Sequence, residues 1–120
     1  MNVLLVDDNR AMRRMVRSAL LQAGVSGLEV EEAENGSDAL AKLASGEPDL
    51  IISDWRMPEM NGVDLLRELR SRGSDVRFGF VTPEEASEAM RETAFEAGAQ
   101  FIIAGPVSAK SLRDALSLAR

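Results

Sequence analysis

Five short apolar runs alternate along the 120-residue chain with segments whose apolar residues recur at helical spacing. Alternating strand and helix patterns with short connections are typical of parallel strands joined by helices that cover both faces of a sheet. The second run, with Val30 between Glu29 and Glu31, has the pattern of an edge strand with one wet face. Five units are too few for a closed eight-stranded barrel. The sequence therefore predicts an α/β fold, a doubly wound open parallel sheet of the (βα)5 type, with strands at residues 3–6, 28–33, 50–53, 76–81 and 101–104.

The segment after each run predicts an amphipathic helix. The first helix carries arginines opposite its apolar residues and should stop at Gly24, and the next two should cover residues 37–44 and 61–70. The fourth is expected to open at Thr82, because Thr82 and Glu85 fit a capping box with Pro83 at the first helical position. The inward residues expected on the first, fourth and last helices are Met12, Met15, Val16, Ala19, Leu20 and Ala23, then Ala86, Ala89, Met90 and Ala97, and finally Leu112, Ala115, Leu116 and Ala119.

The composition excludes several kinds of chemistry. The chain has no Cys and no His, which removes disulfides, thiolate nucleophiles, serine-hydrolase triads and zinc sites built on these residues. A net charge of −6 disfavours sequence-independent binding to nucleic acid or anionic membranes, although Arg10, Arg13, Arg14 and Arg17 could form a local basic patch. No apolar run is long enough to span a membrane, and no signal-like segment opens the chain. We therefore expect a soluble, cytoplasmic protein with one domain, residues 1–120, and no output domain.

Polar side chains follow three of the predicted strands at the point where each strand ends. Asp7 and Asp8 follow the first strand, Asp54 follows the third, and Thr82 follows the fourth. In open parallel sheets the functional site lies at the carboxyl ends of the strands, so these groups should share one rim. Carboxylates without His or Cys favour a hard cation, and Mg²⁺ held by carboxylates keeps positions open for phosphate oxygens. A carboxylate beside that ion can itself be the nucleophile in phosphoryl transfer.

Each of these residues also has a purely structural interpretation. Asp8 or Asn9 could cap the first helix, Thr82 could cap the fourth, and Asp54 could be an ordinary loop acid. The structural interpretations do not explain why acids follow both the first and the third strand.

Four stretches of the sequence resemble the receiver domains of bacterial two-component response regulators. They are residues 3–9 (VLLVDDN), 51–62 (IISDWRMPEMNG), 81–84 (VTPE) and 97–99 (AGA), which stand in the order of that family and span the chain. The resemblance implies the CheY-like, flavodoxin-type fold with strand order 2-1-3-4-5. It implies that Asp54 is the phosphoacceptor and that Asp7, Asp8, Asp54 and the backbone carbonyl of Arg56 hold Mg²⁺. Thr82 would donate a hydrogen bond to the phosphoryl group and shift on activation.

The sequence departs from the family at the end of the fifth strand. Receiver domains usually have Lys-Pro there, with the Lys paired to a phosphoryl oxygen, whereas Gly105 precedes Pro106 in this chain and a one-residue gap would place Ala104 there. The aromatic switch position would be Ile102 without the gap and Phe101 with it. We expect Arg56, on the loop beside Asp54, to replace part of the missing positive charge. Lys110 is a weaker candidate, since it lies inside the last predicted helix.

Three functional classes remain from the sequence. The first is a phosphoacceptor that takes a phosphoryl group from a partner histidine kinase or phosphotransfer protein onto Asp54 and switches a protein-binding face on helix four, strand five and helix five. It would not be an enzyme beyond its own phosphorylation and dephosphorylation. The second is a degenerate receiver that binds proteins without phosphorylation. The third is a small Mg²⁺-dependent phosphatase with Asp54 or Asp7 as nucleophile; the chain offers no cap region for its substrate.

Overall fold

A computed structural model describes residues 1–118 of the chain, and of Leu118 only the backbone. Ala119, expected on the inward side of the last helix, lies outside the described residues. Residues 1–118 form five parallel strands in the order β2-β1-β3-β4-β5, which confirms the predicted sheet and places β2 at an edge. The elements are β1 (Asn2–Val6), α1 (Arg10–Gln22), β2 (Glu29–Ala33), α2 (Gly36–Leu43), β3 (Leu50–Ser53), α3 (Gly62–Ser71), β4 (Arg77–Thr82), α4 (Glu88–Ala97), β5 (Phe101–Ala104) and α5 (Ala109–Leu118).

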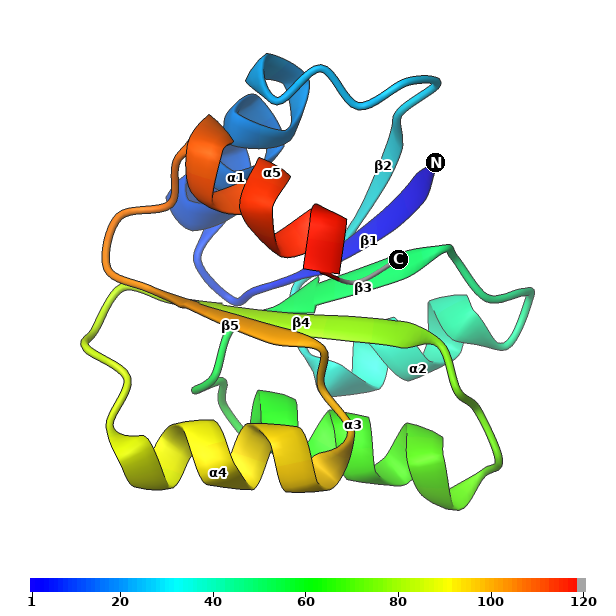
Figure 1. Ribbon diagram of the computed structural model, residues 1–120. Coiled ribbons are helices and arrows are strands. Elements are labelled where there is room, and N and C mark those ends of the chain that lie inside the picture. Colours follow the sequence, from blue (N-terminus) through cyan, green and yellow to red (C-terminus); the bar gives the residue numbers. More distant parts are fainter. Residues whose placement is uncertain (119–120) are drawn as a thin grey trace.

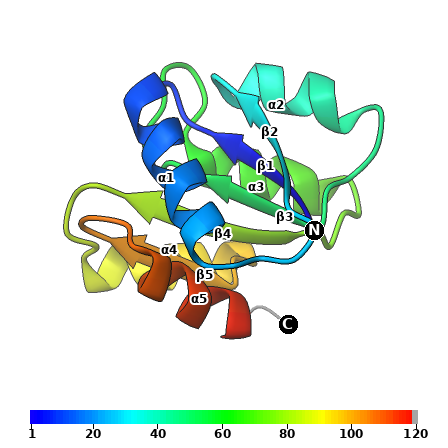
Figure 2. The same cartoon turned by 90° about the horizontal axis from the view of Figure 1, so that it is seen from above.

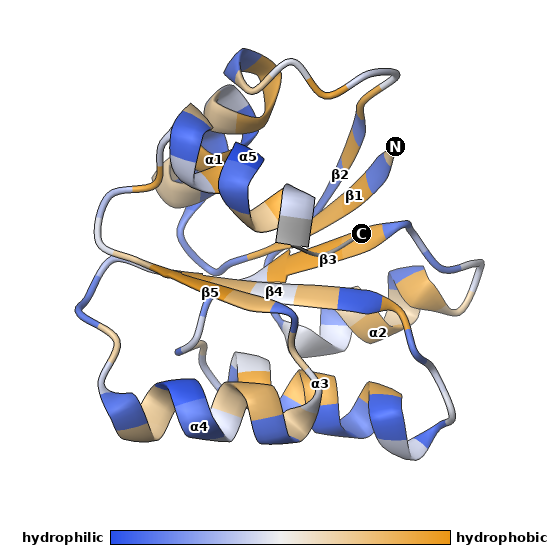
Figure 3. Ribbon diagram, in the orientation of Figure 1, coloured by the Kyte–Doolittle hydropathy of each residue, from blue (hydrophilic) through white to orange (hydrophobic). Residues whose placement is uncertain are grey.

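The helices form two layers on opposite faces of the sheet. Helices α1 and α5 cover one face, and α2, α3 and α4 cover the other (Figures 1 and 2). Successive strand residues point to opposite faces, so each central strand contributes to two hydrophobic cores. Figure 3 shows the strands as mostly hydrophobic, between helices that carry both hydrophilic and hydrophobic residues. Along β1, for example, Leu4 belongs to the core under α2 and α3, whereas Leu5 belongs to the core under α1 and α5. In the described part of the chain, no helix is both long and apolar enough to cross a membrane.

The predicted start of the fourth helix is wrong. Thr82 is the last residue of β4, where it pairs with Ala104 of β5, and residues 83–87 that follow it are not helical. Helix α4 begins at Glu88, and the Ser87 hydroxyl caps it by accepting a hydrogen bond from the Met90 amide at 3.1 Å. The capping box proposed for Thr82 and Glu85 is therefore absent from the described fold.

Two inward positions predicted on the helices are also wrong. Met15 is 47% exposed, because Val16, Ala19 and Leu20 set the buried side of α1. Ala89 is exposed, because α4 turns Ala94 toward the core. Helical spacing identifies both helices, but it leaves the angular position of the buried stripe uncertain by about one residue.

Strand β5 places its aromatic residue on the face covered by α1 and α5. Phe101 belongs to that core, and Ile102 belongs to the opposite core with Phe80. The Phe101 ring occupies the space where a side chain at Gly79, its partner in β4, would begin. Ile102, and not Phe101, therefore shares a face with Phe80 and with the end of β4.

We predict that Gly79→Ala destabilises the fold. The added methyl group would collide with the Phe101 ring, so the free energy of unfolding should fall by about 1–3 kcal/mol, measured by urea denaturation. Adding Phe101→Leu to that variant should restore part of the loss, because the smaller side chain frees the space. A Gly79→Ala protein as stable as the original would contradict this account of the contact.

Candidate functional site

The carboxylates of Asp7, Asp8 and Asp54 form a cluster at the carboxyl ends of β1 and β3. One oxygen atom from each lies within 4.8 Å of the others. The register of the sheet explains this proximity, because Val6 pairs with Ser53 and the next residue of each strand is an aspartate. The ladder continues one step further, with the Asp54 amide donating to the Val6 carbonyl at 2.9 Å. The structure thus brings together the three acids that the sequence placed at one rim.

Thr82 ends β4, the strand beside the one that carries Asp54. Ser53 pairs with Phe80, so Thr82 lies two residues further along and on the same face as Phe80. Thr82 is 3% exposed, and its hydroxyl oxygen accepts a weak hydrogen bond from the Glu84 amide at 3.4 Å. Its hydroxyl proton therefore remains available for an acceptor at the rim.

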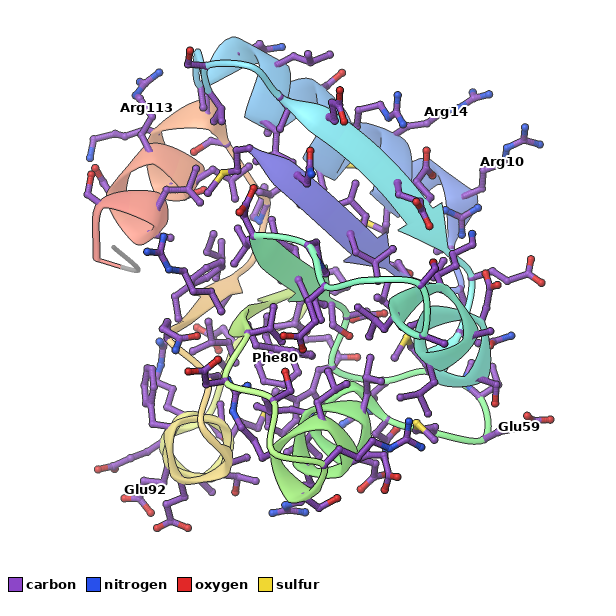
Figure 4. All side chains as sticks on the ribbon, turned by 90° about the vertical axis from the view of Figure 1, so that its right-hand side faces the viewer. Arg10, Arg14, Glu59, Phe80, Glu92 and Arg113 are labelled. Atoms are coloured by element: carbon purple, nitrogen blue, oxygen red, sulfur yellow. The ribbon has the colours of Figure 1, made fainter. Side chains whose placement is uncertain are left out.

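The loop between β3 and α3 fixes the position of Asp54 through hydrogen bonds and close packing. The Trp55 amide donates to the Asp54 carboxylate at 2.7 Å, and the Ser53 hydroxyl donates to the Asp54 carbonyl at 2.9 Å. Gly62 at the start of α3 lies so close to the Asp54 carbonyl that a side chain there would collide with it. The ring of Trp55 meets the buried Phe80 ring edge-on at 4.9 Å between centroids, and Figure 4 shows Phe80 between the sheet and the helices. The loop is therefore packed against the core.

Burial and mutual repulsion set the charge state of the cluster. Burial raises the pKa of Asp7 to about 7, with further increases from the negative charges of Asp54 and Asp8, while a hydrogen bond from the Asn9 amide opposes the shift. Burial also raises the pKa of Asp54, against a hydrogen bond from the Trp55 amide, and the charge of Asp8 adds to the increase. These carboxyls have no cation of the chain paired with them among the described ion pairs.

The donor set fits a hard divalent cation. Three carboxylates offer oxygen ligands close enough to share one ion, and oxygen ligands are what Mg²⁺ prefers. Such an ion would offset the mutual repulsion that adds to the effect of burial on the pKa values of Asp7 and Asp54. The backbone carbonyl of Arg56, two residues after Asp54 on the same loop, stays a predicted fourth protein ligand.

Gly105 stands where the family resemblance implies a Lys, and the space around it is empty. Gly105 follows β5 at the same rim, with φ = 74° and no atom within 4 Å of where a side chain would begin. A residue with a side chain would be strained in this left-handed conformation. Lys110 instead pairs with Asp114 on the exposed side of α5 at 2.9 Å. The guanidinium of Arg56 is 73% exposed and lies 3.8 Å from the carboxylate of Glu84, a partner that the sequence did not suggest.

The four arginines of α1 do not form one basic patch. Arg10 and Arg14 point away from the protein (Figure 4), whereas Arg13 and Arg17 turn toward β2 and pair with Glu32 at 2.8 and 3.3 Å. The one sign of this arrangement in the sequence is the acid Glu32 on the edge strand that follows α1. Asn9 caps α1, as expected for Asp8 or Asn9, by accepting from the Met12 amide at 3.1 Å.

Comparison with known proteins supports the resemblance seen in the sequence. The family model for the response regulator receiver domain matches residues 3–117. The chain is similar to the chemotaxis protein CheY1 of Helicobacter pylori, at 36% identity over 98% of this chain and 95% of that protein. It is also similar to the chemotaxis protein CheY-3 of Vibrio cholerae, at 35% identity over 97% and 88%. A structure of the Vibrio cholerae chemotaxis protein CheY4 superimposes with a TM-score of 0.85 at 31% identity, covering 99% of this chain and 98% of that one.

We predict that the metal-free protein loses stability as the pH rises from about 4 to about 7. The folded state keeps a proton on Asp7 over this range because its pKa is raised to about 7 from 3.8, whereas the unfolded state releases it. Asp7→Asn removes the cost of ionising this buried carboxyl in the folded state. At pH 8 it should therefore raise the free energy of unfolding by about 2–4 kcal/mol, measured by urea denaturation with a chelator present.

Glu31→Gln provides the control for Asp7→Asn. It removes the same charge from an exposed position on β2 and should leave the stability at pH 8 nearly unchanged. If the free energy of unfolding of both variants changed with pH as it does in the original protein, Asp7 would not be the carboxyl whose raised pKa lowers the stability.

Proposed function

This chain belongs to the response regulator receiver domain family, and from that premise we propose that it accepts a phosphoryl group on Asp54 from the phosphohistidine of a partner kinase or phosphotransfer protein. One observation carries the proposal: the Asp7, Asp8 and Asp54 carboxylates converge within 4.8 Å at a rim that Thr82 shares. The 120 residues contain no His, so the donor histidine lies outside them.

The proposed reaction is a transfer between two side chains. An Asp54 carboxylate oxygen attacks the phosphorus atom, the P–N bond to the donor imidazole breaks as the P–O bond forms, and the imidazole nitrogen leaves and takes up a proton. The Trp55 amide, which donates to one Asp54 oxygen, orients the carboxylate for this attack. Thr82 donates its hydroxyl proton to an oxygen of the bound phosphoryl group.

Asp7, Asp8 and Asp54, with the Arg56 carbonyl, would hold Mg²⁺ in this proposal. The ion supplies charge neutralisation for the carboxylates and for the incoming phosphoryl oxygens. Asp7 is buried and Asp8 is exposed, so Asp8 is the acid that meets solvent and an arriving donor. The chain turns over no separate substrate; its chemistry is limited to phosphorylation and dephosphorylation of Asp54.

The proposed output is a change at the face made by α4, β5 and α5, where a downstream protein binds. Thr82 pairs with Ala104 across the sheet, and Ile102 lies on the same face two residues earlier. A movement of Thr82 toward a phosphoryl group would therefore be passed to β5 and to α4, which rests on β5 with few buried residues.

A second candidate function is a degenerate receiver that binds its partners without phosphorylation. The specific observation in its favour is Gly105, which leaves the rim of β5 without a cation. Ile102 in place of an aromatic residue points the same way. In this version the fold and the Mg²⁺ site persist, but the switch does not operate.

We predict two successive changes in the fluorescence of Trp55, the only tryptophan in the chain and the neighbour of Asp54. Mg²⁺ should change its emission first, and a beryllium fluoride mimic or a small phosphodonor should change it again. Asp54→Asn should abolish the second change. A response to Mg²⁺ alone would favour the degenerate receiver, no response to either would sink the Mg²⁺ proposal, and turnover of a small phosphomonoester would favour a phosphatase.

We also predict opposite effects of two charge variants on the rate of phosphorylation by a small phosphodonor. Arg56→Ala should slow it roughly threefold to tenfold, because the incoming dianion loses an exposed cation. Glu84→Gln should accelerate it, because it frees the Arg56 guanidinium from its 3.8 Å ion pair and removes a negative charge. The rate is read from Trp55 emission or from phosphoprotein gels. An unchanged rate in Arg56→Ala would show that this arginine does not replace the missing lysine.

A further inference from the structure

Arg13 connects the acidic cluster to the edge of the sheet. Its side chain is 14% exposed, its Nη1 donates to the Asp7 carbonyl at 2.6 Å, and its Nε donates to the Glu32 carboxylate at 2.8 Å. It also lines a small cavity behind the cluster together with Asp7, Ser53 and Asp54. Arg13 therefore contacts the main chain of the cluster, whereas its charge is paired with Glu32.

Glu32 is held firmly enough to anchor this contact. Its carboxylate also forms an ion pair with Arg17 at 3.3 Å, and its carbonyl accepts a hydrogen bond from the Lys42 ammonium of α2. Arg17 further donates to the Val30 carbonyl at 3.2 Å. Side chains from two helices thus fix the segment of β2 to which Arg13 is tied.

The carbonyl that Arg13 binds belongs to the peptide between Asp7 and Asp8. The other bonds of Asp7 are fixed as well, since its amide donates to the Ala33 carbonyl at 3.1 Å and its carboxylate accepts from Asn9 at 2.8 Å. Asp8 is exposed, and no amide or cation of the described residues holds its carboxylate. The peptide before it sets the backbone position from which this side chain extends, so the Arg13 contact bears on where the Asp8 carboxylate lies.

We propose that Arg13 is a positioning residue for the Mg²⁺ site. By fixing the Asp7–Asp8 peptide, it keeps the carboxylates of both residues directed toward Asp54. This inference rests on the proposed function, because it needs a cation at the three carboxylates. Groups that orient metal ligands typically change metal affinity by roughly tenfold or more when they are removed.

Positioning and simple electrostatics predict effects of opposite sign. Removing a positive charge near three carboxylates should strengthen the binding of a divalent cation if charge alone matters. Removing a group that orients two of those carboxylates should weaken it. Arg17 provides the matched control, because it lies on the same helix and pairs with the same Glu32 carboxylate, while its hydrogen bonds go to β2 and not to Asp7.

The test is a calorimetric titration of the full chain with MgCl₂ at pH 8, on the original protein, Arg13→Ala, Arg13→Lys and Arg17→Ala. We expect the Mg²⁺ dissociation constant to rise roughly tenfold in Arg13→Ala. In Arg13→Lys, which keeps the charge but not the two-pronged contact, it should rise less. In Arg17→Ala it should stay equal or fall. Circular dichroism and thermal unfolding of each variant separate a change in affinity from a loss of fold.

A folded Arg13→Ala protein that binds Mg²⁺ as tightly as the original, or more tightly, would overturn the inference and leave the proposed function intact. An original protein that does not bind Mg²⁺ would overturn the metal site itself, and the inference with it. Should Arg13→Ala fail to fold, the comparison of Arg13→Lys with Arg17→Ala decides the matter. Weaker binding in Arg13→Lys alone supports positioning, and equal binding in the two refutes it.

Discussion

The register between β1 and β3 is the constraint on which the site depends. Val6 lies opposite Ser53, so the aspartate that follows each strand arrives at the same level of the sheet. Two hydrophobic cores, one on each side, fix this register, because a slip of one residue would turn every side chain of a strand to the wrong face. The geometry of the acids is thus specified by the apolar residues that hold the two strands in register.

The cluster costs the fold some of its stability. Three carboxylates lie within 4.8 Å, one of them is buried, and no cation of the described chain pairs with them. Clusters of like charge that destabilise the fold are common at functional sites, because a bound ligand supplies the opposite charge there.

Much of this arrangement follows from the sequence because strands and their ends are local features. The apolar runs identify the strands, and the residue after each run identifies the rim, so Asp7, Asp8, Asp54 and Thr82 could be placed without a structure. The start of α4 could not, because the hydroxyls of Thr82 and Ser87 are both suited to a cap, and only the structure shows that residues 83–87 are not helical. The contact between Arg13 and Glu32 could not be predicted, because it joins residues 19 positions apart and depends on the rotation of α1 about its axis.

The edge strand has a property that follows from the cations around Glu32. In the parallel ladder, Glu29 and Ala33 bond to β1, so the carbonyls of Val30 and Glu32 face outward along the open edge. Arg17 and Lys42 already donate to these two carbonyls. A strand from another molecule would have to displace both side chains and meet the exposed carboxylates of Glu29 and Glu31. The bonds from Arg17 and Lys42 to these two carbonyls therefore oppose extension of the sheet at this edge and aggregation through it.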